Sequence, residues 1–273
     1  MPASYAHYTF GSQVLSEIKN LSIKQLLLGH HDTYDIGLHG PDILFYYKPI
    51  KSNHVSKTGY ALHDKTADNF FDHARQVIKQ ASSQEEKDAA MAYAIGFICH
   101  FALDSECHGY VDDMVKKLSV SHTKIESEFE RLLLDKNHLN PITTRTTAHI
   151  MASEKCASCI APFFQGLMSF EDITPEEILK ALKSFKFYSN LLLAPHKPER
   201  ALIDLVLKLS GHYDFMHGLM ISYKPEPKCE TTNRELYRRY EQAIPVAVRL
   251  IQKFYEAADQ DTPLPERFHR NFE

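Results

Sequence analysis

The sequence has no tryptophan and only five cysteines among its 273 residues. An odd number of cysteines excludes a framework in which every cysteine is paired, and it fits a reducing compartment better. The first ten residues, MPASYAHYTF, have neither the basic start nor the apolar stretch of a secretory signal. We therefore expect a cytoplasmic protein.

Long apolar runs are also missing. The longest, MAYAIGFICHFAL, is too short to span a membrane and is interrupted by His100. The net charge is -4 with histidine counted neutral, and the basic residues are scattered apart from short clusters such as Arg238 and Arg239. Neither a transmembrane segment nor a nucleic-acid-binding surface is therefore favoured. Hydrophobic residues make up 44% of the chain, which is enough for the core of one sizeable domain.

Strand signals are absent, whereas helix signals recur along the chain. No alternating β-branched segments separated by hairpin turns stand out. Ser83 with Glu86, and Thr174 with Glu177, have the spacing of a capping box at a helix start. The expected helices cover roughly 11–28, 66–81, 83–103, 122–135, 142–168, 174–185, 197–210 and 232–258, with loops at 29–62, 186–197 and 211–231. Pro245 is expected to kink the last helix. These signals predict one all-α domain over residues 1–273, with about eight to ten helices.

Histidine is abundant, with 16 residues. The segment CHFALDSECHGY places His100, Asp104 and His108 four residues apart. In an α-helix such side chains drift by only about 40° per step, so they lie along one face. The segment SHTKIE adds His122 and Glu126, again four residues apart, on the helix expected to follow.

These five residues favour a metal site over an ordinary polar surface. A single histidine–acid pair four residues apart is usually a solvated hydrogen-bonding pair. Here His100 and Asp104 lie in an apolar stretch, where burial without partners is costly. Imidazole and carboxylate ligands without a thiolate are typical of catalytic rather than structural zinc. We therefore expect two helices to share a multinuclear zinc site.

Five segments together resemble the zinc-dependent phospholipase C family, which shares its fold with the single-strand-specific zinc nucleases. In chain order they are SYAHY, GPDILFYY, GYALHDK, CHFALDSECHGY and HTKIE. They span residues 1 to about 126, and the rest of the chain is similar to the family only in being helical. The resemblance implies a single-domain multi-helix bundle of the phospholipase C and zinc nuclease type, holding two to three zinc ions.

Carried over motif by motif, the resemblance also implies how the ligands are divided. The first ion would take Asp42, His63 and His100, the second His108, His122 and Glu126, and the third Asp104, His7 and the N-terminal amine and carbonyl. Asp42 would also be the candidate general base. His54 lies at a similar sequence distance from Asp42, but His63 is preferred because the segment GYALHDKTADNFF looks like a ligand at the start of a helix.

The chain departs from the family pattern at its N-terminus and beside Asp42. The secreted relatives expose an N-terminal tryptophan, which this chain lacks. Met-Pro is a start from which the initiator methionine is readily removed, so Pro2 would carry the free amine five residues before His7, as in the nucleases. If Met1 stays, its own amine must reach the site. Ile43 follows Asp42, and the acidic and aromatic residues that cup choline have no clear counterparts, so the headgroup preference stays open.

The expected chemistry is phosphodiester hydrolysis. Bound zinc lowers the pKa of water from about 15.7 to about 7, and clustered zinc ions grip the phosphate during in-line displacement at phosphorus. The expected substrate is a phospholipid or a smaller phosphodiester. A nuclease or phosphomonoesterase on the same scaffold, or a non-catalytic protein that metal only stabilises, are the alternatives, and the oligomeric state is left open.

Two further motifs carry weaker hypotheses. The segment GHHDTYDIG is similar to the centre of the HD-domain phosphohydrolases, but that interpretation leaves the row at His100 unexplained. On either interpretation His30, His31 and His39 are candidates to line the cleft beside Asp42. Cys156 and Cys159 form a lone CxxC with no strand before it, which favours a buried helical pair over a redox site.

Overall fold

The computed structural model describes residues 4–167, 171–210, 213–258 and 262–272. These residues form twelve α-helices and four 3₁₀-helices and contain no strand, which confirms the all-α prediction. The α-helices are α1 (Ser4–Glu17), α2 (Leu21–Gly29), α3 (His31–Gly37), α4 (His54–Asp64), α5 (Asp68–Lys79), α6 (Gln84–Leu118), α7 (His122–Lys136), α8 (Glu154–Ile160), α9 (Pro175–Leu191), α10 (Lys197–Ser210), α11 (Tyr213–His217) and α12 (Glu230–Ala257). The 3₁₀-helices are η1 (Gly40–Tyr46), η2 (Ala161–Phe164), η3 (Pro227–Cys229) and η4 (Glu266–His269).

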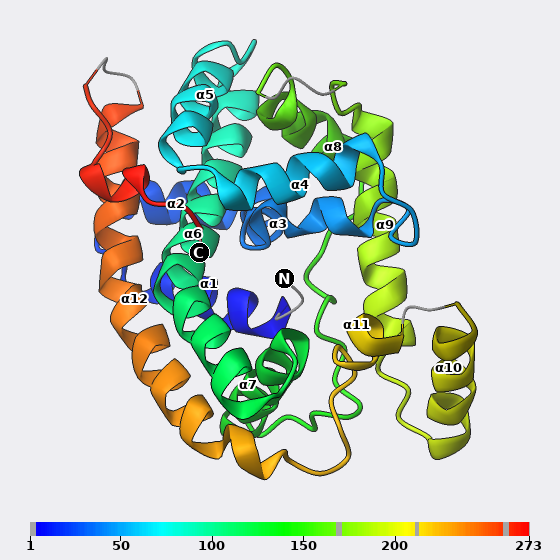
Figure 1. Cartoon of the computed structure of the whole chain (residues 1–273). Coiled ribbons are helices and arrows are strands. Elements are labelled where there is room, and N and C mark those ends of the chain that lie inside the picture. Colours follow the sequence, from blue (N-terminus) through cyan, green and yellow to red (C-terminus); the bar gives the residue numbers. More distant parts are fainter. Residues whose placement is uncertain (1–3, 168–170, 211–212, 259–261, 273) are drawn as a thin grey trace.

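The 35-residue helix α6 runs through the middle of the molecule, with α12 along one side and α1 crossing beside it (Figure 1). The Ser83 hydroxyl accepts a hydrogen bond from the Glu86 amide and begins the helix, and Ser119 ends it in the left-handed conformation, with φ 53°. A side chain at Gly96 would collide with the backbone of α3. Glycine at this position therefore lets α3 lie directly on α6, next to the turn that carries His100.

The last part of the described chain closes the core behind α6. Phe272 is fully buried, and its ring centroid lies 5.7 Å from that of His63 and 6.1 Å from that of His100. The Ala67 amide donates a 2.9 Å hydrogen bond to the Arg270 carbonyl, which ties this tail to the start of α5. The tail therefore supplies an apolar wall for two of the histidines expected to bind metal.

The helices α9, α10 and α11 lie outside this central bundle. Helix α9 packs on η1 and α8, while α10 stands at the edge of the molecule and packs chiefly on α11 (Figure 1). No helix among the described residues combines the length and apolar character that crossing a membrane requires.

Two of the expected helices were wrong. The one over 11–28 is broken in two, because the Asn20 side chain accepts hydrogen bonds from the amides of Ser22 and Ile23 and starts α2. The one over 142–168 is mostly turns as far as residue 153. There the Ser153 hydroxyl accepts from the Cys156 amide, so only the short α8 and η2 form.

The expected loops at 29–62 and 211–231 were also wrong in part. The first contains α3, η1 and α4, and the second contains α11 and η3. A capping box between Asn53 and Ser56 begins α4. These elements are too short to be stable alone, so packing rather than helical periodicity decides them. In α12 the helix continues through Pro245.

Candidate metal centre

Three residues of α6 converge on one polar spot inside the bundle. His100, Asp104 and His108 are only 0%, 2% and 6% exposed. Asp104 Oδ2 lies 3.0 Å from His100 Nε2, and its Oδ1 lies 3.5 Å from His108 Nε2 and 3.3 Å from Nε2 of His7 on α1. Burial alone would raise the pKa of Asp104, but the three imidazoles hold it well below its usual value. An ionised carboxylate is therefore surrounded by three imidazole rings.

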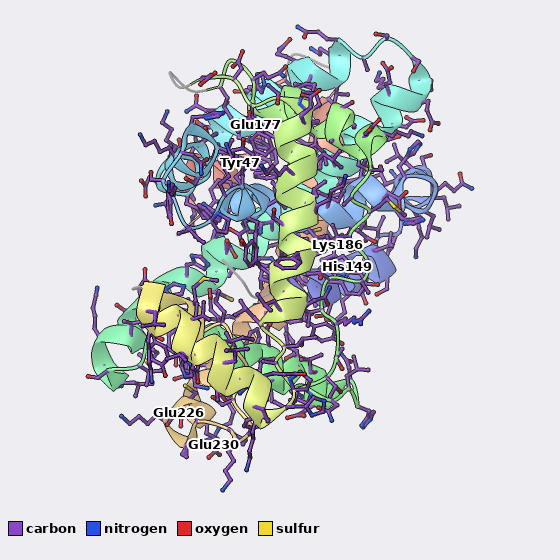
Figure 2. All side chains as sticks on the ribbon, turned by 90° about the vertical axis from the view of Figure 1, so that its right-hand side faces the viewer. Tyr47, His149, Glu177, Lys186, Glu226 and Glu230 are labelled. Atoms are coloured by element: carbon purple, nitrogen blue, oxygen red, sulfur yellow. The ribbon has the colours of Figure 1, made fainter. Side chains whose placement is uncertain are left out.

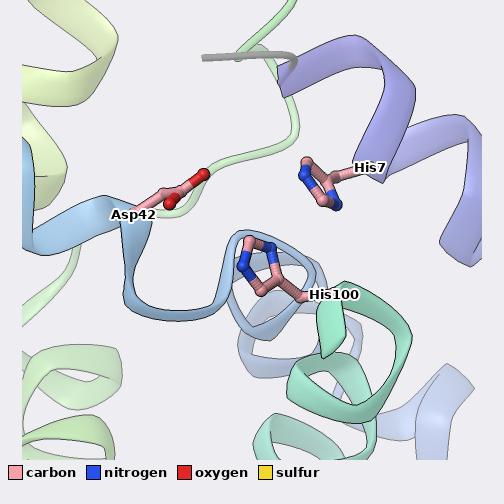
Figure 3. A group of neighbouring side chains, drawn as sticks. All are labelled: His7, Asp42 and His100. Carbon is pink, nitrogen blue, oxygen red and sulfur yellow. The ribbon is translucent and has the colours of Figure 1, made fainter. Parts of the chain in front are cut away.

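A second carboxylate approaches from η1. Figure 3 shows His7, Asp42 and His100 pointing toward one another from α1, η1 and α6. Gly40 has a φ of 48°, and a Cβ there would collide with the His100 ring. Glycine at the start of η1 therefore lets the chain lie against His100 and aim Asp42 at the cluster.

His63 completes this side of the cluster, from the last turn of α4 rather than from the start of a helix as expected. Its Nε2 lies 3.2 Å from Asp42 Oδ1, while its Nδ1 donates a 2.9 Å hydrogen bond to the Gly59 carbonyl. A ring held in this way presents Nε2 to the cluster, the arrangement typical of metal-binding histidines. His54 lies elsewhere, with its Nε2 3.1 Å from Glu177 Oε2.

The start of α7 supplies the other half of the cluster. His122 Nε2 lies 3.0 Å from Glu126 Oε1, and the same oxygen lies 3.8 Å from His108 Nε2. On its far side, His122 Nδ1 lies 3.0 Å from Asp112 Oδ1. Asp112 is four residues after His108 on α6, and it fixes the orientation of the His122 ring. Asp112 is not among the site residues that the sequence predicted.

Among the described residues, three groups have ligand atoms within 4.8 Å of one another, as a shared ion requires. They are His7 with Asp42 and His100, His63 with His100 and Asp104, and His108 with His122 and Glu126.

The donor set fits zinc. Buried atoms of the cluster that have no hydrogen-bond partner include His7 Nδ1, His100 Nδ1 and Glu126 Oε2. Leaving such atoms unpaired is costly unless they serve another purpose. Imidazole nitrogens and carboxylate oxygens without thiolate are the donors of catalytic zinc sites.

All eight ligand candidates from the sequence therefore lie in or beside this cluster. The third group, at His108, matches the set implied for the second ion. The other two groups share His100 and pair His7 with Asp42, so the division of ligands between the first and third ions stays a prediction. The expected contribution of the Met1 or Pro2 amine lies outside the described residues.

A buried acid, Glu130, lies next to the cluster and was missed. Its Oε1 accepts a hydrogen bond from the Tyr5 amide and so caps the start of α1, two residues before His7. Burial raises the pKa of Glu130 to about 8. The signal was present, because His122, Glu126 and Glu130 repeat the spacing of the row on α6. Glu130, Tyr46, Leu192 and seven other residues line a small cavity of about 40 Å³.

A pair of histidines lies beside His7. His39 Nε2 is 2.8 Å from His149 Nε2, and the His39 and His7 ring centroids are 6.4 Å apart. His39 therefore lies beside the cluster, as expected. His149 comes from a segment expected to be helical and was not considered; Figure 2 shows it beside Lys186 of α9.

His30 and His31 lie elsewhere. They line a cavity of about 720 Å³ against α8, here called the α8 cavity. Its other residues of metal-binding type are Asp32, His73, Glu85, Glu86, Cys156 and Cys159. Both cysteines are free, and burial raises the pKa of Cys159 to about 12. His31 is 66% exposed at its side chain and contacts its neighbour Asp32, at 3.2 Å. No HD-type metal centre is thus assembled among the described residues.

Comparison with known proteins gives one match. The family described as zinc dependent phospholipase C matches residues 6–172, which is more than half of the chain and includes all eight ligand candidates. Neither a search of curated proteins nor a search of solved structures found a match.

Proposed function

The chain belongs to the zinc-dependent phospholipase C family, and we propose that it hydrolyses a phosphodiester bond of a phospholipid or of a smaller phosphodiester. The reaction is attack of water at phosphorus, in line with the departing oxygen. A zinc-dependent hydrolase is what the family supports, and the reaction type and the residues are proposed from the geometry of the cluster.

One observation carries the proposal: side chains from five elements bring buried imidazoles and carboxylates to one spot. The proposed zinc ligands are His7, Asp42, His63, His100, Asp104, His108, His122 and Glu126. They would hold two to three ions. When bound, zinc lowers the pKa of water and neutralises charge on the phosphate oxygens. A structure-only role would not require so many ionised groups in the core.

Asp42 is the proposed general base. Burial alone would raise its pKa, but the neighbouring His63 and His100 help to hold it well below the usual range, so the carboxylate is ionised at neutral pH. It receives the proton of the attacking water at an Oδ atom. His63, held by the Gly59 carbonyl, keeps this carboxylate in place.

Three substrates test the proposal on the zinc-loaded protein. We expect cleavage of p-nitrophenyl phosphorylcholine in preference to single-stranded DNA and p-nitrophenyl phosphate. Preference for DNA would assign the scaffold to a nuclease, and preference for the monoester to a phosphatase. Absence of turnover on all three would overturn the enzymatic proposal.

A variant separates catalysis from stabilisation. We expect His108→Ala to lower zinc content and turnover together. If the melting temperature fell while turnover stayed at the wild-type level, the metal would serve the fold alone.

A further inference from the structure

Helix α10 is apolar on the face that points away from the protein. Leu202, Leu205, Val206 and Leu209 are 63%, 54%, 55% and 80% exposed. Their spacing of three and four residues places them on one side of the helix. We call these four residues the outer face of α10.

The opposite side of α10 is already packed. Ile203 and Leu207 lie against a small buried cluster of Leu192, Ala194 and Met220. The residues of the outer face therefore make no packing contact that holds α10 on the protein. A helix of a water-soluble domain ordinarily presents polar residues there, so the apolar outer face marks an interaction surface.

The size and shape of the outer face do not fit a protein partner. The outer face consists of four residues on two turns of one helix, about 10 Å long. A standard protein interface takes about 20–30 residues and about 800 Å² on each partner. The four residues are all aliphatic, whereas the centres of protein interfaces are rich in aromatic residues and arginine. A convex row of aliphatic side chains instead fits shallow insertion among lipid chains.

The charges on α10 agree with a lipid surface. Lys197 and Lys208 are exposed near its two ends, and their long side chains can extend to anionic headgroups. The Lys208 Nζ also lies 4.8 Å from the centre of the Tyr213 ring. Of the two acids on the helix, Asp204 is occupied by His217, with 2.9 Å between its Oδ1 and His217 Nδ1, and Glu199 is exposed near the first turn.

The position of α10 connects the outer face to the metal centre. Leu192 and Leu219, which pack under α10, also line the small cavity that contains Tyr46 and Glu130. Tyr46 belongs to η1 with Asp42, and Glu130 caps the helix that carries His7. In Figure 2, α10 lies across the lower part of the side turned toward the viewer, below α9.

We propose that the outer face of α10 docks the protein on a lipid bilayer, with its aliphatic side chains inserted between headgroups and Lys197 and Lys208 beside anionic headgroups. This docking rests on the proposed function in one respect, namely that the substrate is a lipid. It would hold the enzyme at the surface where that substrate lies.

The absence of tryptophan from the chain makes a direct test possible. Leu209→Trp places a single indole on the outer face, and Leu28→Trp places one at a control position on α2, where the leucine is 60% exposed. The probe is a vesicle made mainly of digalactosyldiacylglycerol with a minor fraction of anionic sulfoquinovosyldiacylglycerol. These lipids contain no phosphate, so binding is scored without hydrolysis. We expect a blue shift of the emission on adding vesicles for Leu209→Trp and none for Leu28→Trp.

A matched pair of double variants tests the energetic role. Leu205→Gln with Leu209→Gln should weaken vesicle binding by roughly tenfold or more, while turnover of soluble p-nitrophenyl phosphorylcholine stays unchanged. The control, Leu21→Gln with Leu28→Gln, should bind vesicles like the wild type. Lys197→Glu with Lys208→Glu, which leaves the apolar residues in place, should weaken binding to the anionic vesicles and lower its salt dependence.

The outcomes distinguish the two proposals. Equal binding by both glutamine variants, or an unshifted Leu209→Trp emission, would overturn docking while leaving the hydrolase proposal intact. A wild-type protein that elutes as a dimer, and becomes monomeric with the Leu205 and Leu209 substitutions, would assign the outer face to a second copy instead. If no phosphodiester is cleaved, the function fails, and the tryptophan emission still decides the docking.

Discussion

The candidate metal centre and the α8 cavity contain the same kinds of side chain in opposite arrangements. In the metal centre, Asp104 alone lies within 3.5 Å of nitrogen atoms of three histidines, all of them buried. Around the α8 cavity the polar groups pair separately instead: His73 donates to the Pro162 carbonyl at 2.9 Å, and Glu85 pairs with Lys155 at 3.0 Å. The two regions thus share residue types, but only in the candidate metal centre do the side chains converge on one point.

The difference shows what distinguishes a site from a polar surface. The α8 cavity is the larger by far, at about 720 Å³ against about 30 Å³ for the space beside His7, Asp104 and His108. The larger cavity is therefore not the site where the ligand-type side chains converge. Buried polar atoms that aim at one point, and lack partners of their own, indicate a metal site more directly.

The largest effect should follow from removing the shared carboxylate. We expect Asp104→Asn to lower turnover by more than about 100-fold, because even groups that only orient a ligand change activity or affinity by about 10- to 100-fold. Turnover and zinc content per chain are the measurements. Glu85→Gln at the α8 cavity is the control and should change neither quantity. Equal losses of turnover and zinc in both variants would show that the two regions do not differ in function.

Removing the metal should cost stability as well. With free zinc about a thousandfold above its Kd, bound metal stabilises the fold by about 4 kcal/mol. Chelation of the purified protein should therefore lower the melting temperature, and added zinc should restore it. The response should persist when His30 and His31 are both replaced by glutamine. Its loss in that variant would place the metal at the α8 cavity.

The two regions also offer a matched pair of histidine–aspartate contacts. His122 lies 3.0 Å from Asp112, and His31 lies 3.2 Å from Asp32. We expect Asp112→Asn to weaken zinc affinity by about 10- to 100-fold, because it frees the His122 ring. Asp32→Asn should leave affinity unchanged. Titration of the apo form of each variant with zinc measures its affinity. Equal affinities in the two variants would show that Asp112 does not position the His122 ring.

The last prediction concerns pH. The pKa of Glu130 is raised to about 8 by burial, and that of Asp35, beside His31, to about 6. An acid with a raised folded-state pKa binds its proton more tightly in the folded chain, so stability falls as pH rises from the unfolded to the folded pKa.

Glu130→Gln should therefore flatten the decline in unfolding free energy up to about pH 8, whereas Asp35→Asn should act only below about pH 6. Denaturant unfolding at several pH values measures this. A wild-type slope retained in Glu130→Gln between pH 6 and 8 would contradict the assignment.

Most ligand candidates of this cluster could be predicted from the sequence, because they repeat at helical spacing. His100, Asp104 and His108, like His122 and Glu126, are one turn apart, so local periodicity alone groups them. Glu130 continues the second row and could have been found in the same way.

Other parts depend on contacts that no local pattern reports. His149 meets His39 from a segment of turns, and Phe272 reaches His63 and His100 from the far end of the chain. The short helices α3 and α4 form because they pack on α6 and η1, which also explains why residues 29–62 were expected to be a loop.

The position of Phe272 bears on how the protein matures. Synthesis delivers all eight proposed ligands by residue 126, but the ring that backs His63 and His100 arrives only with residue 272. Until Phe272 packs, one side of both imidazoles lacks its apolar cover, so the dry environment of these two rings is completed by a contact between residues far apart in the sequence.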